Sequence, residues 1–188
     1  MALSVLEEIR NQKPSELRSR STESLQWFRE QLRKIRVPYN NLITQSGDYV
    51  ESVELGKFYM YVYEAKWKNK LPYWDRFPFV LPFRYASGGF YGVNFHYIRP
   101  ADRLLLLEEL YRYAEEDDVT RIKFTYGMIK SISALKYAKP CVKRYLYDHI
   151  DSRICEVKTE FWDMLVMIPS QNFNENANTV YAQSRNKY

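Results

Sequence analysis

Apolar residues recur at intervals of three and four near the N-terminus, with polar residues between them. This spacing predicts an amphipathic helix that begins at Ser21 and ends at Val37-Pro38, with basic residues on its outer side. A shorter helix precedes it and ends before Pro14, because proline cannot continue a helix. We therefore expect residues 1–45 to form a basic helical arm with one apolar stripe, made by Leu25, Phe28, Leu32 and Ile35.

Strict alternation begins at residue 57, after a polar segment, residues 39–56, that is typical of a linker or loop. In the run from Lys57 to Tyr63, apolar side chains occupy one face and three tyrosines occupy the other: Tyr59, Tyr61 and Tyr63. A strand of this kind is covered on both faces. We expect it to lie in the centre of a sheet, with phenol-tipped side chains on its second face.

Two further strands are predicted after a basic turn at residues 66–70. Pro78 and Pro82 flank a short apolar segment, and because proline donates no ladder hydrogen bond we expect an edge strand there. Gly88-Gly89 supplies a hairpin turn, after which residues 90–98 alternate as a strand. The pattern predicts a small aromatic antiparallel sheet or partial barrel.

The apolar period becomes helical beyond Pro100. Three to four helices are expected to pack on the sheet, which gives an α+β fold class. The predicted elements are helices over 104–113, 120–138, 140–150 and 161–168, and a short strand over 154–157. We expect an α+β core over residues 46–168 and, from its polar composition, an extended C-terminal tail over residues 169–188.

The composition is that of a folded chain with one domain. Its 188 residues are 46% hydrophobic and 27% charged, and this length suffices to bury a core without metals or disulfides. The longest apolar runs are too short to span a membrane, and Glu7 and Glu8 interrupt any signal peptide. We expect neither a membrane segment nor export. The two cysteines, Cys141 and Cys155, fit no disulfide framework and indicate a reducing compartment.

Candidate chemistry is sparse in this sequence. His96, His149 and the two cysteines lack the close spacing of zinc ligands, and the chain has no glycine-rich phosphate loop. The acidic run at residues 115–118 is typical of a solvated helix end. We therefore expect a non-enzymatic protein with no catalytic residues, no metal and no cofactor. A minor alternative is an enzyme whose site combines His96 and Asp75.

Aromatic residues and positive charge are the unusual features. Seventeen Tyr, ten Phe and four Trp suit a core, a protein interface or stacking on nucleic-acid bases. Residues 10–36 carry eight basic and three acidic side chains, a net charge of +5 that equals the net charge of the whole chain. One face of the predicted helix presents arginines to phosphates, to an acidic protein surface or to water. The candidate nucleic-acid-binding residues are Arg18, Arg20, Arg29, Arg33, Lys34 and Arg36, and the candidate protein-interface residues are Leu25, Phe28, Leu32, Ile35, Tyr59, Tyr61, Tyr63, Phe173 and Tyr181.

The stretch from residue 57 to residue 100 carries a recognisable motif. It reads Leu71-Pro72-Tyr73-Trp74-Asp75, Phe77-Pro78, Gly89-Phe90, Gly92, Asn94, His96-Tyr97 and Pro100. On these residues the chain resembles a family of small proteins encoded by T4-like and related contractile-tailed bacteriophages. The resemblance implies a phage product, either a virion component or an assembly factor, without catalytic residues to transfer. It also implies that Asp75, Asn94 and His96 are turn and hydrogen-bonding positions that fix the corners of the sheet.

Two functions follow from these observations. The first is a structural protein of the virion, made in the host cytoplasm: a contractile-tail component at the baseplate or neck. Its terminal arms would join other phage structural proteins in a homo- or hetero-oligomeric assembly. The alternative is a phage nucleic-acid-binding or assembly factor that uses the basic N-terminal helix. Binding to phosphates weakens steeply as salt rises, which distinguishes the alternative from an aromatic protein interface.

Overall fold

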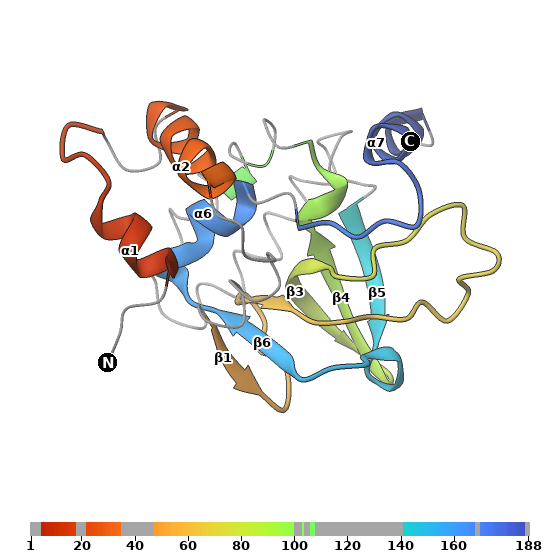
Figure 1. Cartoon of the computed structure of the whole chain (residues 1–188). Helices are drawn as coiled ribbons and strands as arrows, with labels where there is room; N and C mark the ends of the chain where they lie inside the picture. The colour runs from red at the N-terminus through yellow and green to blue at the C-terminus, as the bar shows by residue number, and fades with distance from the viewer. Residues whose placement is uncertain are drawn as a thin grey trace.

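Six strands form one antiparallel sheet in the order β1-β6-β2-β3-β4-β5, with β1 and β5 at its edges (Figure 1). The structure is a computed structural model. It describes residues 5–17, 22–34, 47–99, 103, 106, 107, 141–167 and 170–186. The strands are β1 Gly47–Val50, β2 Phe58–Met60, β3 Phe79–Ala86, β4 Gly89–Asn94, β5 Val142–Leu146 and β6 Ile154–Val157. Strands far apart in the sequence therefore pair, since β6 lies between β1 and β2.

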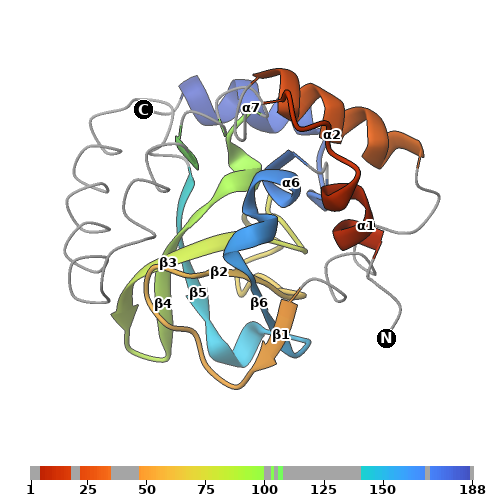
Figure 2. The same ribbon diagram turned by 90° about the vertical axis from the view of Figure 1, so that its left-hand side faces the viewer.

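The described α-helices gather along one side of the sheet (Figure 2). Helix α2 packs against α6, and α7 packs against the 3-10 turn η1. The elements are α1 Val5–Asn11, α2 Thr22–Lys34, α6 Trp162–Met167 and α7 Ala177–Asn186, with 3-10 turns η1 Phe95–Tyr97, η3 Tyr147–His149 and η4 Thr159–Phe161. The α+β class expected from the sequence is confirmed, and none of the described helices is long and apolar enough to cross a membrane.

The helix side of the sheet carries the larger apolar core. Phe58 stacks on Phe79 with ring centroids 4.5 Å apart and meets the edge of Trp162 at 4.8 Å. Residues from every described α-helix join this core, including Ile9 of α1 and Val180 of α7. Burial of these apolar side chains is the main force that holds the helices to the sheet.

The opposite face of the sheet is also buried, and tyrosines dominate it. Tyr59, Tyr61 and Tyr63 are at most 7% exposed and belong to a second core with Phe90 and Tyr145. The alternation of residues 57–63 therefore predicted both faces correctly. Only residues 58–60 form the strand, and the expectation that it lies inside the sheet is confirmed because β2 lies between β6 and β3.

The prediction of an edge strand between Pro78 and Pro82 is wrong. Strand β3 lies between β2 and β4, and Pro82 pairs with Gly92 next to a shift in register. This irregularity accommodates a residue that cannot donate a ladder hydrogen bond. The Pro82 carbonyl still accepts one, from the backbone N–H of Gly56 at 2.9 Å.

The prediction of a helix over residues 140–150 is also wrong, because residues 142–146 form β5 on the free edge of β4. Tyr145 pairs with Phe90, and their rings stack with centroids 5.6 Å apart. Gly89 permits this approach, since a Cβ atom there would lie 1.9 Å from the Tyr145 carbonyl oxygen. The pairing partner lies about fifty residues away in sequence, so local periodicity did not predict β5.

Two other predictions concern the ends of the core. The expected loop over residues 39–56 contains a strand, since β1 pairs with β6. The helices expected over 104–113 and 120–138 fall outside the described residues, apart from Leu106 and Leu107, which are buried in the helix-side core. Of the three to four helices expected on the sheet, these two therefore lie outside the described part of the chain.

The prediction of an extended C-terminal tail is wrong as well. Residues 177–186 form α7, whose Val180 is fully buried, and the preceding residues pack on the protein's own loops. The Asn176 side chain accepts a hydrogen bond from the backbone N–H of Asn178, which caps the start of this helix. The polar composition of this segment therefore did not predict a helix that contributes Val180 to the core.

Candidate nucleic-acid interface

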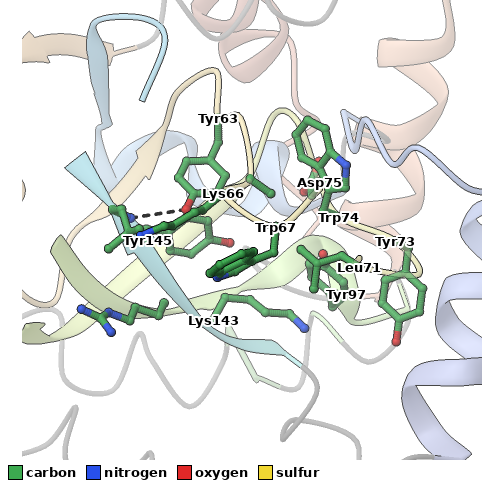
Figure 3. Close-up of a pocket in the computed structure, with 13 residues that line it drawn as sticks. Tyr63, Lys66, Trp67, Leu71, Tyr73, Trp74, Asp75, Tyr97, Lys143 and Tyr145 are labelled. Atoms are coloured by element: carbon green, nitrogen blue, oxygen red, sulfur yellow. Dashed lines mark hydrogen bonds between the residues drawn. The ribbon is translucent and has the colours of Figure 1, made fainter. Parts of the chain in front are cut away.

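A pocket of about 370 Å³ opens between the loop that follows β2 and the strand β5 (Figure 3). In Figure 3 the Trp67 indole occupies the middle of the view, and the Lys143 side chain runs below it. Aromatic and basic side chains make up most of the wall. The lining residues are Tyr63, Ala65, Lys66, Trp67, Leu71, Tyr73, Trp74, Asp75, Tyr97, Lys143, Arg144, Tyr145 and Leu146.

Backbone hydrogen bonds shape the loop that carries Trp67. The N–H groups of Lys70 and Leu71 both donate to the Trp67 carbonyl, at 2.8 and 2.9 Å, which closes a tight turn. At the start of the loop, the N–H of Glu64 donates to the carbonyl of His149 at 2.9 Å. The loop is therefore held at its base, while its tip presents Trp67 with 57% of its surface exposed.

Positive charge surrounds this indole. The ammonium nitrogens of Lys66 and Lys70 lie 5.7 and 5.2 Å from the centre of the Trp67 ring, a distance at which cations are attracted to an aromatic face. Lys68 is different, since it forms an ion pair with Glu64. Across the pocket, the Lys143 ammonium lies 4.2 Å from the centre of the Tyr97 ring.

Buried tyrosines form the inner wall. Tyr63 and Tyr145 meet edge to face with centroids 5.0 Å apart, and the Tyr63 hydroxyl accepts a hydrogen bond from the backbone N–H of Leu146 at 3.4 Å. Burial raises the pKa of Tyr63 above its ordinary value, and raises the pKa values of Tyr97 and Tyr145 well above it. These phenols stay neutral, so the tyrosines add no negative charge to the wall.

Asp75, which also lines the pocket, accepts four hydrogen bonds. Its Oδ1 accepts from the backbone N–H groups of Phe77 at 3.1 Å and Asn172 at 3.0 Å. Its Oδ2 lies 3.1 Å from Asn94 Nδ2 and 2.7 Å from His96 Nδ1. These bonds fix the loop that carries Trp74 to the end of β4. They also confirm that Asp75, Asn94 and His96 are hydrogen-bonding positions at the corner of the sheet.

The protonation states of Asp75 and His96 follow from burial and from this contact. Burial alone would raise the pKa of Asp75, but the interaction with His96 and the bonds from Asn172 and Asn94 outweigh it and hold the pKa below its ordinary value. Burial lowers the pKa of His96 and outweighs the attraction of Asp75. The pair is therefore an ionised carboxylate that accepts the Nδ1–H of a neutral imidazole.

Asp75, His96 and Ser170 are connected in the way that a hydrolytic triad is connected. His96 Nδ1 contacts Asp75, and His96 Nε2 lies 3.0 Å from Ser170 Oγ. His96 is fully buried, however, and donors on the protein occupy both oxygens of Asp75. Both ring nitrogens of His96 are engaged within the protein, by Asp75 and by Ser170. The contact instead ties the C-terminal segment to the sheet.

That segment supports the pocket from behind. The N–H of Trp74 donates to the Asn174 side chain at 2.6 Å, and the N–H of Arg76 donates to the Asn172 carbonyl at 2.8 Å. Further along, the buried guanidinium of Arg103 donates to Val166 O at 3.0 Å and to the Tyr181 hydroxyl at 3.2 Å. The C-terminal residues thus position the pocket loop.

Of the candidate residues chosen from the sequence that the structure describes, only Tyr63 lines this pocket. Lys34 is exposed and donates to Gln31 at 3.2 Å, while Phe28, Tyr59, Tyr61 and Tyr63 are buried in the protein's own cores. Phe173 packs on Tyr97 at 5.0 Å, and Tyr181 bonds to Arg103. The remaining candidates lie outside the residues, or the side chains, that the structure describes: Arg18, Arg20, Leu25, Arg29, Leu32, Arg33, Ile35 and Arg36.

Sequence reasoning missed the pocket, although a signal for it exists. Residues 66–70 place a tryptophan among three lysines, Lys-Trp-Lys-Asn-Lys, whereas the sequence analysis predicts only a basic turn there. An aromatic residue between basic residues is the pattern that binds nucleotides by stacking and by charge. Lys143 joins them only through the fold, about seventy residues later in the sequence.

Comparison with known protein families identifies the family of this chain. The family model described as "Phage T4 terminal DNA protecting protein" matches residues 2–186, while no curated protein and no solved structure matches significantly. The resemblance to T4-like phage proteins is confirmed at the level of the phage group. The prediction of a tail or baseplate component is wrong, because the matching family protects DNA ends, and the nucleic-acid alternative fits better. The chain belongs to the phage T4 terminal DNA protecting protein family.

Proposed function

We propose that this phage protein binds the ends of linear DNA and shields them from degradation, acting by occupancy and without catalysis. The observation that carries the proposal is the match of almost the whole chain, residues 2–186, to a family of terminal DNA protecting proteins. A protein that remains on the end of packaged DNA enters the particle with it. The virion localisation expected from the sequence is therefore part of the proposal.

The charge of the chain supports binding to DNA. The net charge is +5 and the isoelectric point is about 9.0, so the protein is attracted to phosphates at neutral pH. The pocket adds a local site where exposed Trp67 lies close to two lysines. Helix α2, whose sequence contains Arg29, Arg33 and Lys34, stays a second candidate contact with the phosphate backbone.

The test is a comparison of DNA with and without ends. A linear duplex and a dumbbell of the same sequence, closed by a loop at each end, are titrated with the protein at about 50 and 200 mM salt. We expect tighter binding to the linear duplex at both concentrations, with both affinities falling as salt rises. Equal affinity for the two DNAs would contradict end recognition, and the absence of binding to either would contradict a DNA-binding function.

A further inference from the structure

The pocket at Trp67 has the dimensions of a small-ligand site. Its volume of about 370 Å³ lies near the lower end of the range of roughly 300–1,000 Å³ that is usual for such sites. A single nucleotide is a ligand of this size, whereas a base-paired duplex is much wider. The pocket therefore fits one unit of a nucleic acid and not a double helix.

The aromatic group at its mouth is unusually accessible. Trp67 is 57% exposed, whereas Trp162 is 4% exposed and lies in the helix-side core. An indole face open to solvent stacks readily on a nucleobase, and such stacking strengthens binding by about 5- to 150-fold per base. In duplex DNA neighbouring pairs cover both faces of every internal base, so an indole reaches a base only at an unpaired nucleotide or on the outer face of the terminal pair. A pocket of about 370 Å³ holds the single nucleotide and not the base pair.

The charges around the indole suit the phosphate of that nucleotide. Lys66 and Lys70 lie within 6 Å of the Trp67 ring and form no ion pair among the described residues. Two carboxylates at the site are already engaged. Glu64 pairs with Lys68, and Asp75 is 3% exposed and accepts a hydrogen bond from His96. The accessible charge at the pocket mouth is positive.

We propose that this pocket binds an unpaired nucleotide at the end of DNA, with its base stacked on Trp67 and its phosphate close to Lys66 and Lys70. The inference rests on the proposed function and adds the structure that is recognised at the end: an overhang or a frayed terminal nucleotide, in preference to a flush base pair. An acidic peptide is the competing occupant, because it offers negative charge but no base to stack.

Two hairpin DNAs test this inference, one with a blunt open end and one with a short single-stranded overhang. Binding of the full chain and of Trp67→Ala and Trp67→Phe is measured with each DNA. Tyr85→Ala is the matched control, because Tyr85 is also 57% exposed but lies on β3 and not in the pocket wall. Circular dichroism verifies that each variant is folded.

We expect the wild type to prefer the overhang, and Trp67→Ala to lose about 5- to 150-fold in affinity for it while binding the blunt end unchanged. Trp67→Phe recovers part of the loss, and Tyr85→Ala binds like the wild type. Lys70→Gln reduces the salt dependence of overhang binding.

Other outcomes overturn the inference. If Trp67→Ala binds both DNAs as the wild type does, the pocket does not hold DNA. This is the result expected if an acidic peptide is the natural occupant. If the variant loses affinity for both DNAs equally, Trp67 does not select an unpaired nucleotide, although end binding stands. If the wild type binds neither DNA, the proposed function fails together with the inference.

Discussion

Replacement of Asp75 by alanine tests how the fold supports the pocket. The carboxylate is 3% exposed and accepts hydrogen bonds from Phe77, Asn94, His96 and Asn172. Alanine leaves these four donors buried without an acceptor. Each unsatisfied buried donor costs about 1–3 kcal/mol, and because the site relaxes in part we expect a loss of about 3–5 kcal/mol of the free energy of unfolding. Small proteins have roughly 5–15 kcal/mol in total, so the loss is a large part of the stability.

Urea unfolding followed by tryptophan fluorescence measures this loss. With a slope of about 2 kcal/mol per molar urea, the midpoint of Asp75→Ala falls by about 2 M. Asp148→Ala is the control, because this carboxylate is exposed in η3 and its removal changes the stability by less than about 0.5 kcal/mol. If Asp75→Ala unfolds at the midpoint of the wild type, the network does not stabilise the fold and the reasoning is refuted.

Three further predictions concern the same elements. Because the pKa values of Asp75 and His96 are lowered in the native state, the unfolded chain binds protons that the native state does not. The melting temperature therefore falls as the pH decreases below about 6.5, and in His96→Gln it falls less steeply. Gly89→Ala destabilises the protein in urea by about 3 kcal/mol, since its Cβ would meet the carbonyl of Tyr145, whereas Gly88→Ala, with open space but φ of 69°, costs about 1 kcal/mol. Removal of residues 170–188 lowers the urea midpoint, because Asp75 and His96 lose their partners there; an unchanged midpoint would show that this segment is dispensable for folding.

Local patterns predicted those parts of the fold whose burial is set within a short segment. The alternation of residues 57–63 predicted two buried faces, and both cores contain the expected side chains. The proline rule failed at Pro82 because a shift in register accommodates it inside the sheet. Strand β5 was missed because its pairing depends on Gly89, which lies far away in the sequence.

The candidate site was predicted less well than the fold, for a physical reason. Its aromatic and basic groups come from a loop after β2 and from β5, and only tertiary structure brings Trp67, Tyr97 and Lys143 to one pocket. The density of basic residues in the sequence predicted a binding site on α2 instead. The polar C-terminal residues were expected to be extended because their anchors, Asp75 and Arg103, are distant in sequence.

The most direct test of the central claim is nuclease protection of linear DNA. The protein is bound to a linear duplex, and the full-length DNA that remains is followed over time with an exonuclease and, separately, with an endonuclease that cuts internally. We expect the exonuclease to be blocked in proportion to the protein bound at the ends, while internal cutting proceeds at the rate of free DNA. Exonuclease digestion at the rate of free DNA, or equal protection against both enzymes, would contradict a protein that protects DNA ends.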